Sequence, residues 1–168
     1  VCHQIFDIHN QYKLNIYNGD FLKFSPLQEW GITAFDVVMG NPPYNMGGIR
    51  SHTGKQLGKV NKTIWPEFVK KSIEWLKSDG YLINITPLSW LKKSHSIHNL
   101  MLERHIVHLT LWDDSQSKNA IHSDIPISMF VLQNKDNTSK EMTAVTSILK
   151  RKNIHSKCFE YLNPANSI

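Results

Sequence analysis

The sequence predicts an α/β protein built on an open sheet, and three neighbouring segments carry this prediction. Residues 35–40, "FDVVMG", form an apolar run bounded by turn residues, as in a buried parallel strand. Residues 63–80 follow as an amphipathic helix, and residues 81–86, "YLINIT", as the next buried strand. A strand, a helix and a strand in this order form the βαβ unit of a parallel α/β sheet.

The elements around this unit are predicted from local patterns in the same way. Residues 12–17, "YKLNIY", read as a short strand closed by "NGD". Residues 45–63 are rich in Gly, Lys, Asn and Ser, which predicts a long loop. In the helix predicted over 63–80, Pro66 suits the first turn and Gly80 the end.

Three strands and one helix are predicted in the second half of the chain. Residues 96–104 are expected to form a short helix. Residues 106–112 and 125–133 are expected to form a pair of strands, joined by a polar segment in which the acidic pair 113–114 predicts a turn. Residues 141–149 predict one more strand.

Composition places the chain among ordinary globular proteins. It has 168 residues, of which 40% are hydrophobic and 20% charged, and this length suits one domain with a real core. No apolar run approaches the ~20 residues of a membrane span. Cys2 and Cys158 lack the spacing of metal ligands or of a disulfide framework, which makes an intracellular location the default.

Nine histidines raise the question of a metal site. His95 with His98, and His105 with His108, have suggestive spacings, but no cluster of Cys or carboxylate residues completes a set of four ligands. No metal is therefore expected, and these histidines are interpreted as surface or half-buried residues.

Positive charge is concentrated in one part of the chain. Lys and Arg outnumber Asp and Glu by 19 to 14, and the window between Asp36 and Glu67 has no acidic residue. Within it lie four basic residues, which are Arg50, Lys55, Lys59 and Lys62. Such a window suits the phosphate backbone of a nucleic acid, and a merely solvated loop is the alternative.

The segment "NPPY", residues 41–44, directly follows the predicted strand 35–40. Pro42 and Pro43 each fix their own φ and restrict the preceding residue to an extended conformation, so Asn41 is expected to be held rigidly past the strand end. Ligands bind at this edge of open α/β sheets. Backbone carbonyls and the Asn41 amide could accept hydrogen bonds from an NH2 group, and Tyr44 could stack on a flat ring. A nucleobase with an exocyclic amine meets both demands, whereas a rigid turn closing the strand is the alternative.

At these residues the chain resembles a known family. "FDVVMGNPPY" resembles the catalytic motif of S-adenosylmethionine-dependent amino-methyltransferases, most closely that of N6-adenine-specific DNA methyltransferases of restriction–modification type. "NIYNGDFL" is similar to the segment that places an acidic residue against the adenine of the cofactor, which implies that role for Asp20, with Phe21 packing nearby. Residues 64–91 and 101–133 are similar to the later helix and strands of this family.

The resemblance implies both a fold and a mechanism. The fold is a Rossmann-like methyltransferase open sheet. In the mechanism, an adenine is flipped out of DNA and stacked on Tyr44, and its N6 amine donates hydrogen bonds to the Asn41 side-chain carbonyl and the Pro42 backbone carbonyl. These bonds draw the nitrogen lone pair out of conjugation and aim it at the methyl group of S-adenosylmethionine.

Parts of the family pattern are not found in the sequence. The glycine-rich cofactor loop and the ribose-binding acid would precede residue 1, so the sheet is expected to lack its first strands and the isolated chain to be incomplete. Residues 1–150 are then interpreted as the C-terminal part of a catalytic domain. Residues 151–168 are interpreted as a linker or the start of a target-recognition region. The second aromatic residue of the family falls on Ala120, and the sequence leaves open whether Trp112 or His122 replaces it.

Two alternatives from other functional classes remain open at this point. One is a methyltransferase of a different amine, either a base in RNA or a glutamine side chain in a protein. The other is a fragment that binds nucleic acid without catalysis. The basic window favours nucleic acid over protein as the partner, but it does not distinguish DNA from RNA.

Overall fold

The chain divides into two compact units, residues 1–33 and 34–168, and each is described by itself. The computed structural model describes residues 9, 11–12, 14–46, 62–137, 141–148 and 155–159.

The first unit contains a 3-10 turn, η1 (Phe21–Lys23), and a short helix, α2 (Pro26–Trp30). Ser25 caps α2, because its Oγ accepts a hydrogen bond from the Gln28 N–H at 3.4 Å. The ring of Phe24 packs between Tyr17 and Trp30, with a centroid distance of 4.6 Å to each.

The strand predicted over residues 12–17 is wrong. Residues 14–17 lie outside any helix or strand. A β-strand needs a neighbouring strand to take its backbone hydrogen bonds, and the described part of this unit contains none. Tyr17 of this segment packs instead against Phe24 in the small aromatic cluster.

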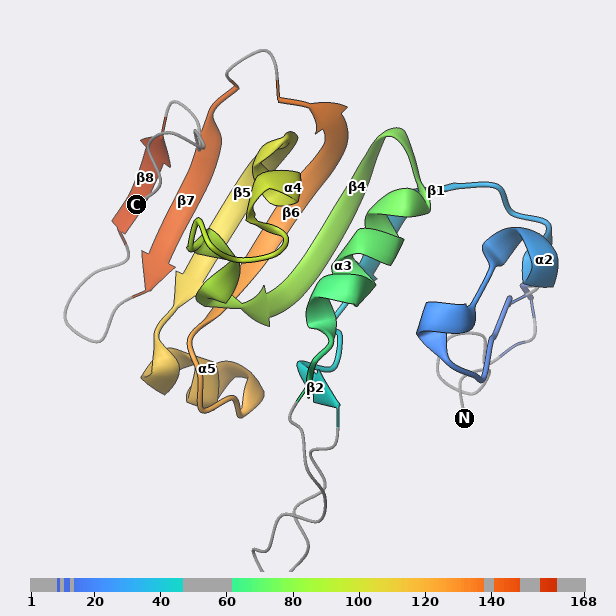
Figure 1. Cartoon of the computed structure of the whole chain (residues 1–168), viewed down its shortest axis with the longest axis horizontal. Coiled ribbons are helices and arrows are strands. Elements are labelled where there is room, and N and C mark those ends of the chain that lie inside the picture. Colours follow the sequence, from blue (N-terminus) through green and yellow to red (C-terminus); the bar gives the residue numbers. More distant parts are fainter. Residues whose placement is uncertain are drawn as a thin grey trace, which may run out of the picture. The chain divides into compact units, whose positions relative to one another are not determined.

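The second unit is built on a six-stranded sheet with the order β1-β4-β6-β5-β7-β8 (Figure 1). The strand pairs β1·β4 and β5·β7 are parallel, and the other three pairs are antiparallel. The expected Rossmann-like α/β open sheet is thus confirmed. Its strands are β1 (Phe35–Gly40), β4 (Leu76–Pro87), β5 (Arg104–Trp112), β6 (Ile127–Asp136), β7 (Thr143–Ile148) and β8 (His155–Phe159).

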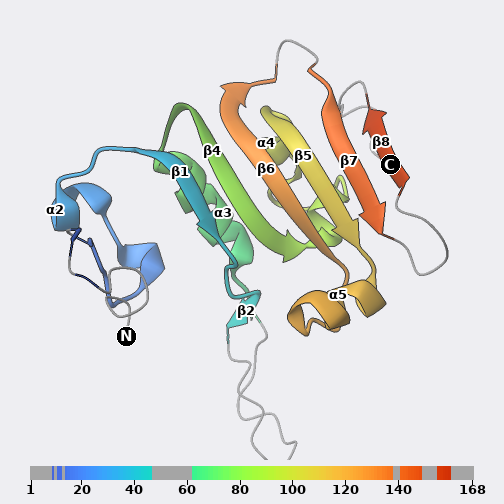
Figure 2. The same ribbon diagram turned by 180° about the vertical axis from the view of Figure 1, so that it is seen from behind.

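Two helices, α3 (Trp65–Glu74) and α4 (His98–Leu102), lie on the same face of this sheet (Figures 1 and 2). The core fills the space between them and the strands, and it includes Trp65 and Val69 of α3, Met101 of α4, and Leu82, Leu109 and Phe130 of the sheet. Trp65 is expected from its helical spacing to be a core residue, and its exposed fraction of 1% confirms this. No helix in the described ranges is both long and apolar enough to cross a membrane.

The helix predicted over residues 63–80 is shorter than expected. It ends at Glu74, and β4 already begins at Leu76, so Gly80 lies within a strand instead of ending a helix. A Cβ at Gly80 would lie 3.1 Å from the backbone oxygens of Phe35 and Asp36, so this glycine permits the close approach of the neighbouring strand.

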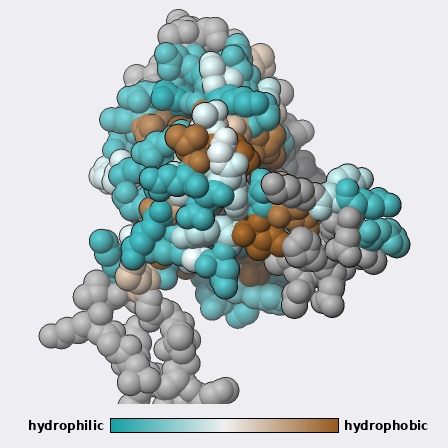
Figure 3. Space-filling model, turned by 90° about the vertical axis from the view of Figure 1, so that its right-hand side faces the viewer, coloured by the Kyte–Doolittle hydropathy of each residue, from teal (hydrophilic) through white to brown (hydrophobic). Residues whose placement is uncertain are grey.

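Strand β1 has the predicted bounds and the predicted parallel partner, but it is not buried. Val37 and Met39 are 49% and 72% exposed, because they point to the face of the sheet opposite to Val38, which packs on the core. The apolar run alone could not distinguish an edge strand from a central one. Figure 3 shows hydrophobic side chains gathered in small patches on a face that is otherwise mostly hydrophilic.

The polar segment between β5 and β6 forms a helix, α5 (Asp114–Ile121), where the acidic pair had predicted a turn. Asp113 is its N-cap and accepts a hydrogen bond from the Gln116 N–H at 3.0 Å. The other predictions for this half, a short helix, a strand pair and one further strand, are confirmed as α4, β5 with β6, and β7. Strand β8 was not predicted.

A buried polar network joins β4, β6 and the segment between β4 and α4. The indole N–H of Trp90 donates to Ser128 Oγ at 2.9 Å, and Ser128 Oγ lies 3.3 Å from Thr86 Oγ1. His98 Nδ1 donates to the Trp90 carbonyl at 2.9 Å. All four residues are at most 3% exposed. Since buried polar groups are costly without partners, Ser128 is the centre of this network.

We expect Ser128→Ala to lower the free energy of unfolding by about 1–3 kcal/mol, because it leaves the Trp90 N–H buried without an acceptor. Urea unfolding followed by tryptophan fluorescence measures this change. The control is Ser94→Ala, a change at an exposed serine, which should stay within about 0.5 kcal/mol of the wild type. Equal stabilities of the two variants would contradict the role of Ser128.

Candidate functional site

Residues 41–44 leave the C-terminal end of β1. Gly40, the last residue of β1, lies opposite Asn84 of the parallel strand β4, so the segment starts at the edge where both strands end. Asn41 and Pro43 are exposed, and Pro42 and Tyr44 are half-buried. No hydrogen bond holds the Asn41 side chain within the described residues, so its amide carbonyl is available to a ligand.

Tyr44 is the residue of this segment that turns inward. Its ring packs against the hydrophobic core, and its backbone carbonyl accepts a hydrogen bond from the Ile64 N–H at 3.1 Å. Its hydroxyl is buried and has no partner among the described residues. Burial raises the pKa of the Tyr44 phenol, so this group stays neutral at neutral pH.

A two-stranded ribbon continues from Tyr44. Strand β2 (Asn45–Met46) pairs antiparallel with β3 (Lys62–Thr63), and the Thr63 hydroxyl donates to Asn45 Oδ1 at 3.5 Å. Lys62 is exposed on this ribbon. The other basic residues of the predicted nucleic-acid contact, Arg50, Lys55 and Lys59, lie outside the described residues.

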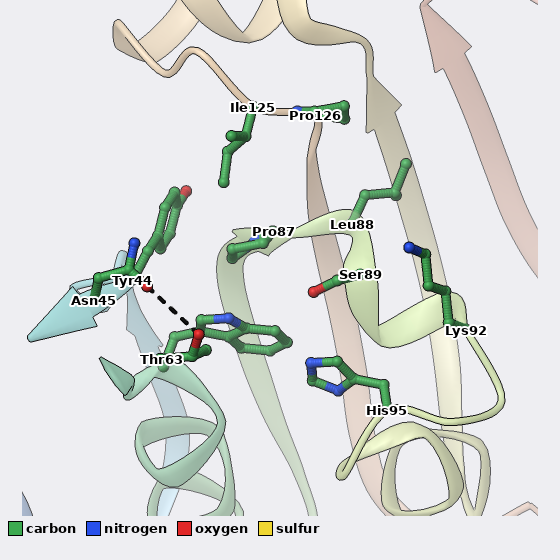
Figure 4. Close-up of a pocket in the computed structure, with 11 residues that line it drawn as sticks. Tyr44, Asn45, Thr63, Pro87, Leu88, Ser89, Lys92, His95, Ile125 and Pro126 are labelled. Atoms are coloured by element: carbon green, nitrogen blue, oxygen red, sulfur yellow. Dashed lines mark hydrogen bonds between the residues drawn. The ribbon is translucent and has the colours of Figure 1, made fainter. Parts of the chain in front are cut away.

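The ribbon borders a cavity of about 580 Å³ (Figure 4). Tyr44, Asn45 and Thr63 lie on one side of it. The opposite side, hereafter the polar side, carries the polar residues Ser89, Lys92 and His95 next to the apolar Leu88. Ile125 and Pro126, which precede β6, close a third side. The cavity therefore combines an aromatic ring, a cation and apolar contacts.

His95 forms part of the cavity wall as a neutral imidazole. Its ring is stacked on Trp65, with a centroid distance of 5.0 Å and an interplanar angle of 18°. Its Nδ1 accepts a hydrogen bond from the Ile97 N–H at 3.5 Å, which leaves Nε2 as the protonated nitrogen. Burial, and then the neighbouring His98, lowers the pKa of His95, so it is uncharged at neutral pH.

Sequence reasoning found Tyr44 but missed the polar side of the cavity. His95 was considered only as a possible metal ligand, and Ser89 and Lys92 carried no motif. Ser89, Lys92 and His95 follow one another at intervals of three positions, and this regular spacing is the signal that could have grouped them. Asn41, Pro42 and Pro43 do not line the cavity but lie directly before Tyr44 in the chain.

The candidates for a second aromatic residue lie near α5. Ala120 is exposed on this helix, Trp112 is half-buried at the end of β5, and His122 follows the helix with a φ of 56°. None of the three lines the cavity, where Ile125 and Pro126 contribute instead. In the described ranges, no three His, Cys, Asp or Glu side chains are grouped so that they could hold a metal ion.

Asp20 and Phe21 belong to the first unit. Asp20 Oδ1 accepts a hydrogen bond from the Leu22 N–H at 3.0 Å and so caps η1, and Oδ2 lies 3.8 Å from Lys23 Nζ. The Asp20 side chain is 51% exposed, so its carboxylate retains acceptor capacity. This fits a contact with an exocyclic amine such as that on the adenine of a cofactor.

The open α/β sheet, with this segment at its edge, has the Rossmann-like fold that the sequence predicts. The sequence model of a family described as the Eco57I restriction-modification methylase matches residues 3–117, which include Asp20, Asn41 and the polar side of the cavity. The chain belongs to the Eco57I restriction-modification methylase family.

Two curated relatives are similar to parts of the chain. The type II methyltransferase M.TthHB8I of Thermus thermophilus is 31% identical over 44% of this chain and 19% of its own length. The modification methylase CviBIII of Paramecium bursaria Chlorella virus NC1A is 35% identical over 46% of this chain and 19% of its own. The chain thus matches about a fifth of each relative.

Two solved structures are also similar. The methyltransferase subunit of a type I restriction–modification system from Streptococcus thermophilus has a TM-score of 0.48 and 19% identity, over 79% of this chain and 31% of its own. A protein from Listeria monocytogenes, described as a class I S-adenosylmethionine-dependent methyltransferase, has a TM-score of 0.46 and 15% identity, over 70% of this chain and 38% of its own.

We expect the state of His95 to make the protein less stable in mild acid. The unfolded chain binds a proton at the ordinary pKa of 6.5 and the folded protein only at lower pH, so stability falls as the pH drops below 6.5. His95→Gln removes this contribution and should flatten the loss between about pH 7 and pH 5. Urea unfolding at several pH values measures the slope, and an unchanged slope in the variant would contradict this account.

Proposed function

We propose that this chain is part of an S-adenosylmethionine-dependent enzyme that methylates the N6 amine of adenine in DNA. The observation that carries the proposal is the segment Asn41–Tyr44, which leaves the ligand-binding edge of the sheet and delivers Tyr44 to a cavity wall. Membership of a restriction–modification methylase family supports DNA as the substrate. Residues 1–150 would then serve as the C-terminal part of the catalytic domain, and residues 151–168 as a linker or the start of a target-recognition region.

Asn41 and Pro42 would accept the two hydrogens of the adenine amine. Asn41 is exposed, and no described residue forms a hydrogen bond with its side-chain carbonyl. Pro42 and Pro43 restrict the backbone from which this side chain projects. Two hydrogen bonds to acceptors pull the amine out of the plane of the ring and make its lone pair available for attack. No strong base is required, because positioning and electrostatic stabilisation lower the barrier.

Tyr44 would hold the flipped base by stacking. An aromatic ring contributes about 1–3 kcal/mol to the binding of an unstacked base. Half-burial of Tyr44 against the core keeps the ring in one orientation, so the base is oriented along with it. The neutral phenol adds no charge that would repel the phosphates of the nucleic acid.

When bound, S-adenosylmethionine supplies the methyl group as an electrophile. Asp20 would accept a hydrogen bond from its adenine amine, and Phe21 would pack nearby. The half-exposed carboxylate of Asp20 supports this assignment. An N-terminal segment would provide the remaining contacts, and a C-terminal target-recognition domain would choose the DNA site.

We expect Asn41→Ala in the full-length protein to slow methyl transfer by about 100-fold or more, as for the loss of one oxyanion-hole group. Asn41→Asp should be milder because it keeps an acceptor. Single-turnover transfer of a labelled methyl group to DNA measures the rate, and mass spectrometry of the digested DNA identifies N6-methyladenine.

The matched control for this experiment is Asn99→Ala, at an exposed position on α4, which should behave like the wild type. A single-turnover rate for Asn41→Ala within about threefold of the wild type would contradict the mechanism. Methylation of RNA or of a protein glutamine would point to the alternative amine substrates, and DNA binding without transfer would point to a non-catalytic role.

The basic window would contact the DNA backbone through Arg50, Lys55, Lys59 and Lys62. We expect the double change Lys55→Glu and Lys59→Glu to weaken binding to all DNA sequences alike. The slope of log K against log salt should fall by about 0.9 for each phosphate that the protein no longer neutralises. Titrations at several salt concentrations measure both effects, and wild-type affinity and slope would mean that the segment is only a surface loop.

A further inference from the structure

We propose that Lys92, with Ser89 beside it, binds the backbone phosphate of the nucleotide whose base occupies the cavity. This inference rests on the proposed function and deepens it, because it assigns the polar side of the cavity to the sugar–phosphate end of the flipped nucleotide. Lys92 would act as a positioning residue that holds the nucleotide while Tyr44 holds its base.

Three consecutive tight turns place this polar side. The Lys92 N–H donates to the Ser89 carbonyl at 3.1 Å, the His95 N–H to the Lys92 carbonyl at 2.9 Å, and the His98 N–H to the His95 carbonyl at 3.0 Å. Each turn brings the chain back within four residues, from Ser89 to Lys92, from Lys92 to His95 and from His95 to His98. Ser89, Lys92 and His95 therefore form a row along the cavity (Figure 4).

The row is held firmly by its neighbours in sequence. Trp90 and Ile97 are fully buried at 0% exposure, and His98 is 3% exposed. The Leu88 N–H also donates to the Pro126 carbonyl at 3.1 Å, which ties the start of the row to the segment before β6. The backbone from which Ser89, Lys92 and His95 project is thus anchored at both ends, as a specific site requires.

Charge singles out Lys92 within the row. Other lysines are paired with acidic side chains, for example Lys70 with Glu67 at 3.0 Å and Lys118 with Asp124 at 3.3 Å. Lys92 takes part in no ion pair with any described residue, and none of the described residues that line the cavity is acidic. Its ammonium group points into the cavity (Figure 4). An unpaired cation in such a place attracts an anion, and the neutral His95 beside it adds no second charge.

The two sides of the cavity match the two ends of a nucleotide. The Tyr44 side offers an aromatic ring for a base, and the Ser89–Lys92 side offers a hydroxyl and an ammonium for a phosphate. The volume of about 580 Å³ has room for more than a ring alone. A bare nucleobase would leave the cation unused, whereas a nucleotide satisfies both sides at once.

The test combines a change in the protein with a change in the DNA. The full-length protein is given duplexes that contain its modification site, found by sequencing methylated DNA, with a neutral methylphosphonate at the phosphate 5′ or 3′ of the target adenine. Lys92→Met and the neutral phosphate should each raise the Kd and slow single-turnover methylation by about tenfold or more, as for the loss of a charge-assisted hydrogen bond. At the contacted phosphate, the two changes together should cost no more than one alone.

Two further variants control for a general effect of charge or of structure. Lys93→Met removes the adjacent exposed lysine, which does not line the cavity, and it should leave the methylphosphonate effect unchanged. Lys92→Arg keeps the charge and should restore most of the affinity.

The inference would be overturned if the losses caused by Lys92→Met and by the methylphosphonate multiplied at both tested phosphates. It would also be overturned if Lys92→Met and Lys93→Met changed the Kd and the rate equally. A wild-type protein whose methylated base proves not to be adenine would refute the proposed function instead. The Kd comparison, with the methylphosphonate placed beside the base that is methylated, would then still decide the role of Lys92.

Discussion

The cavity depends on one constraint, which is that β1 and β4 run parallel. Because their C-terminal ends meet at the same edge, the segment after β1 and the segment after β4 leave the sheet side by side. The first carries Asn41–Tyr44 and the second carries Ser89–His95. Strand β6 runs antiparallel to β4 and pairs Ile127 with Pro87, so it starts at this edge and brings Ile125 and Pro126 with it. Three segments distant in sequence thus converge on one place.

Buried hydrogen bonds keep these segments in position. Trp90 separates Ser89 from Lys92 and turns its indole into the core, where Ser128 accepts its N–H. The polar side of the cavity is therefore attached to β6 through a side chain that faces away from the cavity. Tyr44 is held in a similar way, because its ring packs against the core while the neighbouring residues Pro43 and Asn45 are exposed. Rigidity in both cases comes from burial beside the site.

The separation of roles in the cavity suits a substrate that is aromatic at one end and anionic at the other. Tyr44 and Trp65 lie close to its surface, while Lys92 and Ser89 stand across from Tyr44. The lowered pKa of His95 keeps a hydrogen-bonding imidazole uncharged next to this cation. Such an arrangement offers stacking, charge and directed hydrogen bonds together, so that no single contact must supply all of the affinity.

The sequence by itself determined the strand 35–40, the helix after it, the next strand, and the place of Asn41–Tyr44 at a strand end, because apolar periodicity and proline geometry act locally. Tertiary structure alone decided that β1 is an exposed edge strand, that α3 stops at Glu74, and that Ser89, Lys92 and His95 face Tyr44. These features arise from contacts between distant residues, such as the bond from Trp90 to Ser128, 38 positions apart. A local pattern specifies which element forms, but burial and cavity walls depend on which elements meet.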